Sequence, residues 1–415
     1  MKAAVATAIV SLALLALPAS GARGAAFVEG ATTTVGFWAG EAVPGTDWEN
    51  PDSYWNRRDT HLYTPGVWQA LAENQIPIYF NLRYKRDFGP VPPGQPRRHD
   101  ALPILREANR LGVPIWGWVL VPYTDGYWAS EGNALEQFRA VKSLVGWARR
   151  EGVVLQGLAL DPEPPVGTPQ EASAALLGGA GAAALPTLLA RPTNPAGQCA
   201  AWSMYERTAI WARNHHVTLS AAPMPTALDD LEDGRLALED ASDFVLPPAP
   251  WHELFFQAYR SVFAYHAGVD PGPGIVTSYL RSARRQFWDK GQVSLGSAGR
   301  GPYRRFKTLL HDVRLAATLH AGELPIYSLE RTLRSYGGAR ALTRLVQAAH
   351  HPFTGQLART ATTPTPEADA IRATIRANDA ALAAATGEIT TKAGVGTQEA
   401  NSWPEGCASW TVAAP

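Results

Sequence analysis

The sequence is poor in cysteine and methionine and has no excess of charge of either sign. It holds 2 cysteines and 3 methionines in 415 residues, and 37 Lys and Arg residues are matched by 37 Asp and Glu residues. Balanced charge gives no electrostatic basis for binding nucleic acid or an anionic membrane, so we expect neither as a partner. Cys199 and Cys407 lie in no CxxC motif and beside no paired histidine, so we expect no metal site built on thiolates.

The chain begins with an apolar run that is too short to span a membrane. Residues 3–17 are apolar, follow Lys2 and precede small residues at 18–22. A spanning helix needs roughly 20 apolar residues, whereas this layout is typical of a secretory signal peptide. We therefore expect residues 1–25 to be removed on export, leaving a secreted, extracellular or periplasmic monomer without membrane association. In an oxidising compartment we expect one disulfide between Cys199 and Cys407.

Short strand-like runs alternate with longer helix-like segments, a pattern that predicts a parallel sheet with crossover helices. A doubly wound open sheet would carry a glycine-rich phosphate turn after its first strand, and VGFWAGEAVPG has none. Eight runs are enough to close a barrel. They cover residues 35–40, 76–84, 113–122, 155–164, 217–225, 253–261, 292–301 and 324–330.

The sequence thus predicts an α/β fold of the (β/α)8 barrel class, a TIM barrel, with an additional C-terminal helix. We expect one barrel domain over residues 26–360, with residues 361–415 forming a helix and a tail packed on it. The longest connection, residues 166–217, is rich in Ala, Gly and Leu. A surface insertion without a role is the simpler interpretation, and a lip over the active-site mouth is the alternative.

Active sites of such barrels lie at the carboxyl ends of the strands, which selects the polar residues found there. We expect substrate-binding residues among Glu41, Arg83, Tyr123, Asp125, Trp128, Gln257, Tyr259 and Arg300. Aromatic side chains past the third run, Tyr127 and Trp128, suit stacking on sugar rings, although such residues more often pack in a barrel core. Arginines such as Arg83 and Arg300 match acidic groups, although solvated surface arginines are the better explanation of them.

The most informative segment is LALDPEPP, which ends the fourth run. Asp161 and Glu163 are two residues apart, so they project to the same side of an extended strand, with their Cα atoms about 6–7 Å apart. At that spacing one carboxylate raises the pKa of the other, as general acid catalysis of glycosidic bond cleavage requires. We expect Glu163 to be the general acid and Asp161 to tune it. Solvated loop carboxylates, or a divalent metal site with further oxygen ligands, are the alternatives.

Asp-x-Glu at the end of the fourth strand of a secreted barrel resembles the catalytic strand of glycoside hydrolase family 18, the chitinase type, and of the family 25 lysozymes. The likeness covers the last three residues of the motif, because Gln156 and Ala159 stand where family 18 has two further Asp residues. The resemblance implies Glu163 as proton donor and Asp161 as its partner. In family 18 the substrate's own N-acetyl group is the nucleophile, held by a strand-six tyrosine, and Tyr259 and Gln257 stand at the corresponding place.

A second arrangement resembles the large clan of retaining glycosidases, with a nucleophile on a late strand. Glu330 is then the catalytic partner of Glu163, or alternatively a structural partner of Arg331 or Arg83. We expect a secreted, cofactor-independent glycoside hydrolase acting on a polysaccharide or cell-wall glycan. The rival hypotheses are a non-catalytic carbohydrate-binding barrel and a metal-dependent lyase or esterase barrel.

Overall fold

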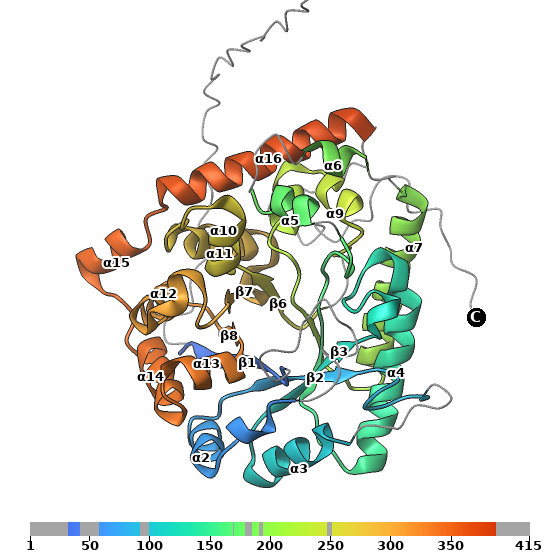
Figure 1. Cartoon of the computed structure of the whole chain (residues 1–415), viewed down its shortest axis with the longest axis vertical. Helices are drawn as coiled ribbons and strands as arrows, with labels where there is room; N and C mark the ends of the chain where they lie inside the picture. Colours follow the sequence, from blue (N-terminus) through green and yellow to red (C-terminus); the bar gives the residue numbers. More distant parts are fainter. Residues whose placement is uncertain are drawn as a thin grey trace, which may run out of the picture. The chain divides into compact units, whose positions relative to one another are not determined.

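Eight parallel strands close into a barrel in the computed structural model of the chain (Figure 1). The structure describes residues 32–41, 58–91, 99–168, 170–178, 185–190, 194–246 and 251–386. Each strand pairs with the next in sequence, and the last pairs with the first, for example through Phe37 opposite Ile326. The strands are β1 (Thr34–Ala39), β2 (Ile78–Arg83), β3 (Ile115–Leu120), β4 (Gly157–Leu160), β5 (Leu219–Ala221), β6 (Leu254–Gln257), β7 (Gly291–Gly296) and β8 (Glu323–Tyr327).

Helices surround the barrel and lie in the connections between its strands, as the predicted alternation requires (Figure 1). Two of them, α3 and α4, end at Gly112 and Gly152, which adopt the left-handed conformation with φ angles of 71° and 66°. Glycine adopts this conformation without steric cost because it has no side chain. The helices are α2 (Pro65–Glu73), α3 (Ala101–Leu111), α4 (Ala134–Glu151), α5 (Gln170–Leu176), α6 (Leu185–Leu189), α7 (Pro195–Asn214), α8 (Ala227–Asp233), α9 (Ala237–Ser242), α10 (Arg260–Ala267), α11 (Gly274–Phe287), α12 (Phe306–Thr318), α13 (Leu329–Tyr336), α14 (Ala339–His350), α15 (Gly355–Ala361) and α16 (Pro366–Thr386).

Alternation along the strands separates two apolar cores. Side chains that point outward, such as Phe37 and Phe80, pack beneath the helices in the larger core. Side chains that point inward form an aromatic core inside the barrel, in which the Trp38 ring lies 5.2 Å from Trp118 and 4.7 Å from Tyr79. Bulky interior rings fill the barrel, so it is a packed core rather than a pore.

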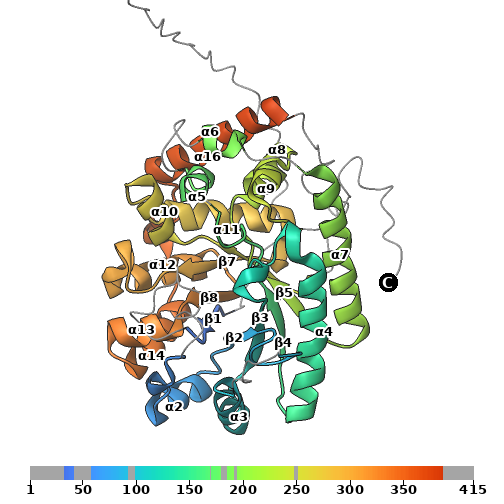
Figure 2. The same ribbon diagram turned by 45° about the vertical axis from the view of Figure 1, so that its right-hand side comes forward.

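The C-terminal helix α16 lies across α5, α6, α8, α9 and α11 (Figures 1 and 2). Its Arg372 contacts Asp229 of α8 at 2.6 Å and Glu232 at 3.0 Å. Asp229 is fully buried and also accepts a hydrogen bond from Tyr279 of α11 at 2.9 Å. Because the guanidinium of Arg372 neutralises a buried carboxylate and donates hydrogen bonds to it, α16 has one favoured position on the barrel wall.

The structure confirms the predicted (β/α)8 barrel and its additional C-terminal helix, with strands two to six residues shorter than the predicted runs at most positions. Cys199 is buried in α7, while its predicted partner Cys407 lies outside the described residues, as do the predicted signal peptide and the tail after residue 386. Within the described ranges, none of the helices combines the length and apolarity needed to cross a membrane.

Candidate active site

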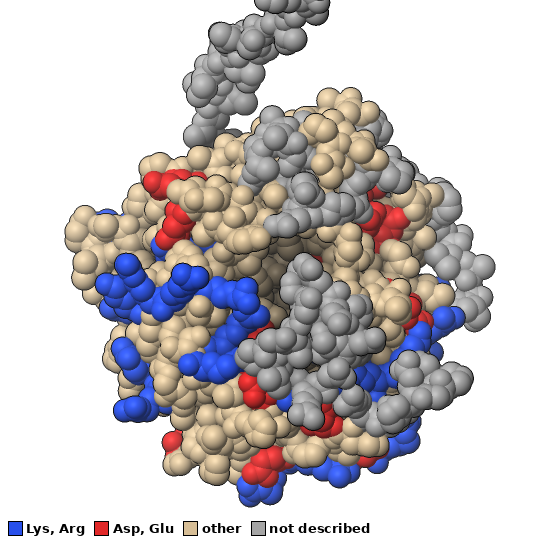
Figure 3. All heavy atoms as spheres, in the orientation of Figure 1, with Lys and Arg blue, Asp and Glu red and all other residues tan. Residues whose placement is uncertain are grey.

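A cleft of about 300 Å³ opens at the carboxyl ends of the barrel strands. Figure 3 shows the face onto which it opens, hollowed near its centre. Every strand except β2 contributes a lining residue from its end or from the loop that follows, which is the position expected for a barrel active site. The lining includes Trp38, Trp118, Tyr127, Trp128, Asp161, Glu163, Val166, Thr168, Ser173, Leu176, Leu177, Met224, Gln257, Tyr259, Val262, His266, Ser297 and Tyr327.

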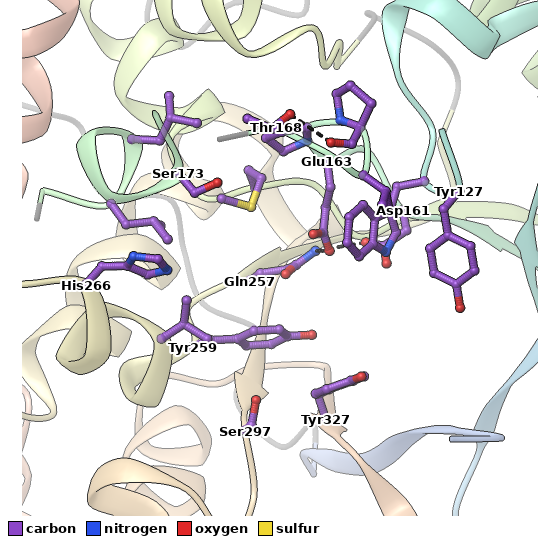
Figure 4. A pocket seen from close by; sticks show the side chains of 18 of the residues that line it. Tyr127, Asp161, Glu163, Thr168, Ser173, Gln257, Tyr259, His266, Ser297 and Tyr327 are labelled. Carbon is purple, nitrogen blue, oxygen red and sulfur yellow. Dashed lines mark hydrogen bonds between the residues drawn. The ribbon is translucent and has the colours of Figure 1, made fainter. Parts of the chain in front are cut away.

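The two carboxylates of the β4 end meet one amide group from β6. The side-chain nitrogen Nε2 of Gln257 lies 2.8 Å from Oδ1 of Asp161 and 2.6 Å from Oε1 of Glu163 (Figure 4). The backbone between the carboxylates is held by Ala129, which donates to the carbonyl of Asp161 at 2.9 Å and accepts from the amide of Glu163 at 3.2 Å. Extended backbone with alternating side chains places both carboxylates on the cleft side.

Burial sets the protonation of this pair. Burial raises the pKa of Asp161 well above its usual range, and the neighbouring charge of Glu163 raises it further. Burial also raises the pKa of Glu163. The amide of Gln257 acts against burial, because it donates to the ionised form of both groups and so lowers both pKa values. The pair therefore retains a proton at a pH where isolated carboxyl groups are ionised.

Tyr259 presents its hydroxyl group to the cleft, opposite the carboxylates (Figure 4). Its ring stacks on Tyr327 of β8 with a centroid distance of 5.9 Å. The ring also lies against Gly296, where a Cβ atom would come within 2.9 Å of it, so the glycine gives the ring its space. Burial and the charge of Asp161 raise the pKa of Tyr259, so the phenol keeps its proton and can donate a hydrogen bond.

Aromatic rings form the floor and one wall of the cleft. Trp38 and Trp118 are buried at the floor, and the indole nitrogen of Trp38 donates to Oγ of Ser294 at 2.9 Å. The predicted stacking residues Tyr127 and Trp128 both line the cleft, with their ring centroids 5.3 Å apart. Flat apolar rings beside carboxylates suit the faces of sugar rings.

Of the predicted site residues, the structure brings Asp161, Glu163, Trp128, Gln257 and Tyr259 together in the cleft. It does not bring Glu330 there. This residue lies in the first turn of α13, where Oε1 accepts hydrogen bonds from the amide of Gly40 at 2.7 Å and from the hydroxyl of Tyr63 at 2.5 Å. Burial and the charge of Glu41 raise the pKa of Glu330 to about 7.

The remaining predicted binding residues also lie outside the cleft lining. Glu41, rather than Glu330, is the partner of Arg331, at 2.7 Å. Arg83 is buried and donates from Nε to Oδ1 of Asn81 at 3.1 Å. Asp125 pairs with Lys85 at 3.0 Å, Tyr123 packs its ring 5.7 Å from Tyr127, and Arg300 is exposed in the loop after β7.

One wall of the cleft comes from a segment that the sequence interpretation left without a role. Thr168, Ser173, Leu176 and Leu177, from the connection after β4, face the cleft together with His266 of α10. The alternative interpretation of this connection, a lip at the mouth, describes its placement better. Its departure from the carboxyl end of β4 was the signal for that placement.

The described parts of the chain contain no group of three or more His, Cys, Asp or Glu side chains arranged to hold a metal ion. Together the fold and the site define a closed (β/α)8 barrel with two carboxylates at the end of β4 that share one amide group of β6.

No protein-family model matches the chain, and no curated protein matches its sequence. Solved structures that resemble it include glycoside hydrolases of several families. A family 18 chitinase catalytic domain from the fern Peteris ryukyuensis has 11% identity and a TM-score of 0.41, covering 77% of this chain and 100% of its own. A family 5 broad-specificity endoglucanase from Clostridium acetobutylicum has 12% identity and a TM-score of 0.45, covering 76% and 96%. A psychrophilic family 10 endo-β-1,4-xylanase has 10% identity and a TM-score of 0.37, covering 82% and 96%.

Proposed function

We propose that this protein is a glycoside hydrolase in which Glu163 is the general acid and Asp161 its partner. The observation that carries the proposal is the carboxylate pair at the carboxyl end of β4, in which buried Asp161 and half-buried Glu163 share the amide of Gln257. A cleft lined by indole and phenol rings supplies surfaces for sugar faces next to that pair. The substrate we propose is a polysaccharide or cell-wall glycan.

The proposed reaction uses the proton that the pair retains. Glu163 donates this proton to the glycosidic oxygen as the bond from that oxygen to the anomeric carbon breaks. The two carboxyl groups share one proton, and the negative charge that the pair carries supports the positive charge that develops on the sugar ring. Water then adds its hydroxyl to the anomeric carbon and returns a proton to Glu163, which closes the cycle.

The group that first attacks the anomeric carbon is either water or a group of the substrate itself, which water then displaces. Among the described cleft residues, the carboxylates are Asp161 and Glu163, and Glu330 lies elsewhere. This favours a reaction in which no carboxylate from another strand acts as the nucleophile. Tyr259 and Gln257 both line the cleft and could hold such a substrate group (Figure 4). We further propose, on the sequence pattern of residues 1–25, that the protein acts outside the cytoplasm.

The test is hydrolysis of a panel of polysaccharides and peptidoglycan by the mature protein, Glu163→Gln and Glu107→Gln. Glu107 is exposed on α3 and pairs with Arg110 of the same helix, so its variant is the matched control. We expect Glu163→Gln to lose activity by about 10²–10⁴-fold, the usual contribution of a general acid, with its melting temperature retained. On aryl glycosides with a good leaving group the loss should be much smaller, because that group departs without protonation.

Binding of glycans without turnover by the unaltered protein and by both variants would instead identify a carbohydrate-binding barrel. An equal loss in Glu163→Gln on good and poor leaving groups would contradict the role of Glu163 as the acid.

A further inference from the structure

Basic side chains gather on the cleft face over the loop after β7 and the neighbouring ends of α12 and α14. Figure 3 shows Lys and Arg atoms forming a band there that reaches toward the central hollow. We call this set the basic rim and define it by six exposed residues. They are Arg300, Arg304, Arg305, Lys307, Arg340 and Arg344.

No acidic side chain of the described residues pairs with the basic rim. None of its six side chains forms an ion pair with a residue in the described ranges. The acidic side chains nearby are already engaged: Asp312 contacts Arg260 at 2.9 Å, and Glu41 contacts Arg331 at 2.7 Å. A neutral chain overall therefore presents a locally positive surface, because many of its acidic groups, such as Asp229 and Glu239, are buried.

The backbone that carries the rim is firmly held. Tyr303 is buried beneath the loop and donates to Oδ2 of Asp312 at 2.9 Å. The hydroxyl of Tyr336 accepts from the amide of Gly299 at 2.7 Å, and its ring stacks on Phe306 at 4.5 Å. The guanidinium of Arg344 lies 4.8 Å from the centre of the Phe306 ring. Charges presented from a fixed loop lose less conformational entropy when they bind a ligand.

The rim is continuous with the cleft. Ser297 and Tyr327 line the cleft, and the amide of Arg300 donates to the carbonyl of Ser297 at 3.2 Å. Ala298, which follows Ser297, donates its amide hydrogen to the carbonyl of Tyr327 at 2.8 Å. A polymer that occupies the cleft and leaves it past β7 and β8 would therefore pass the loop that carries Arg300.

We propose that the basic rim is a binding site for the anionic groups of a polysaccharide, so that the substrate class of this barrel is an acidic glycan. Guanidinium groups bind carboxylates and sulfates through paired hydrogen bonds. When sugar rings of such a polymer occupy the cleft, charged groups on its neighbouring sugars can bind the rim. The substrate assignment rests on the proposed glycosidase function, whereas the binding of anionic glycan at the rim can be measured without turnover.

The experiment measures binding by the full mature chain carrying Glu163→Gln, which prevents hydrolysis. The probes are polygalacturonate for carboxylates, dextran sulfate for sulfates, neutral dextran and single-stranded DNA, each at low and high salt. The rim variant adds Arg300→Gln, Arg304→Gln and Arg305→Gln. The matched control adds Arg149→Gln, Arg150→Gln and Arg213→Gln, three exposed arginines near the ends of α4 and α7, without ion pairs to described residues.

We expect the rim variant to bind polygalacturonate or dextran sulfate about tenfold or more weakly, with the control unchanged, and the difference to shrink at high salt. The polymer that responds tells which anionic group the rim takes. Equal weakening in the control, equal binding by the rim variant, or DNA binding as tight as glycan binding would overturn the proposal. If the unaltered protein hydrolyses a glycan but the rim variant binds the anionic polymers unchanged, only the rim assignment fails. If Glu163→Gln keeps full hydrolysis, the proposed catalytic role of Glu163 fails independently of the rim.

Discussion

The amide nitrogen Nε2 of Gln257 lies 2.6 Å from Oε1 of Glu163, and the same nitrogen lies 2.8 Å from Oδ1 of Asp161. It also lies 2.9 Å from the carbonyl of Ala222. Three acceptors thus surround a single amide group on β6, and two of them are carboxylates that share a proton. The geometry makes Gln257 the residue that holds the pair together and limits how far burial raises the two pKa values.

Replacing Gln257 by Leu should shift the pH dependence of activity upward. The amide stabilises the ionised carboxylates, so its loss raises the pKa of both Asp161 and Glu163, and both limbs of the profile move to higher pH. A pH profile of kcat/KM measures the shift. Gln69→Leu, on the exposed face of α2, is the control and should leave the profile in place. A profile that moves to lower pH in Gln257→Leu would refute this account of the amide.

Tyr259→Phe keeps the stacked ring and removes the hydroxyl that faces the cleft. We expect kcat/KM to fall by about 10- to 100-fold, the value of one hydrogen bond to a developing charge, while the melting temperature stays nearly constant. The stability should hold because the hydrogen bond that this hydroxyl accepts from Oγ of Ser294, within the described residues, has the long distance of 3.5 Å. Tyr265→Phe, on the exposed side of α10, serves as control. Unchanged kinetics in Tyr259→Phe would remove this hydroxyl from the mechanism.

Arg372→Met should destabilise the fold by about 3–5 kcal/mol, because it leaves the carboxylate of Asp229 buried with its main counter-charge removed. Arg376 also contacts Asp229, at 3.3 Å, but its side chain is 40% exposed, so Arg376→Met should cost much less. Urea unfolding of both variants gives the comparison. Equal losses would contradict the larger role that burial gives to Arg372.

Glu239→Gln should make the protein more stable at alkaline pH. Burial raises the pKa of Glu239 to about 8, above its unfolded value of 4.5, so the native state holds a proton that the unfolded chain releases. Glu239 therefore costs the unaltered protein no stability below pH 4.5, and its cost grows as the pH rises toward 8. The variant should gain roughly 3–5 kcal/mol at pH 9 and nothing at pH 4. Urea unfolding at both values measures the difference, and a constant difference between them would contradict the raised pKa.

Sequence periodicity was sufficient for the eight strands, because a two-residue alternation and a helical repeat are local properties of the chain. It was also sufficient for the carboxylate pair, since two residues of extended backbone return a side chain to the same face. Periodicity did not reveal that Glu330 lies outside the cleft, because Glu330 follows the end of β8 just as the cleft residues follow the ends of their strands. Contacts with Gly40 and Tyr63, distant in sequence, turn it into the protein interior.

The sequence by itself determined the barrel class and the placement of Asp161 and Glu163 on one side of β4, because both follow from repeats within short segments. Only the tertiary structure decided that Gln257 of β6 meets both carboxylates, and that the connection after β4 walls the cleft. Tertiary packing also decided that the basic rim stands beside the cleft, without an ion pair to any described residue. The reason is physical: these relationships depend on which strand ends and loops pack side by side, and that packing is set by contacts between residues far apart in the chain.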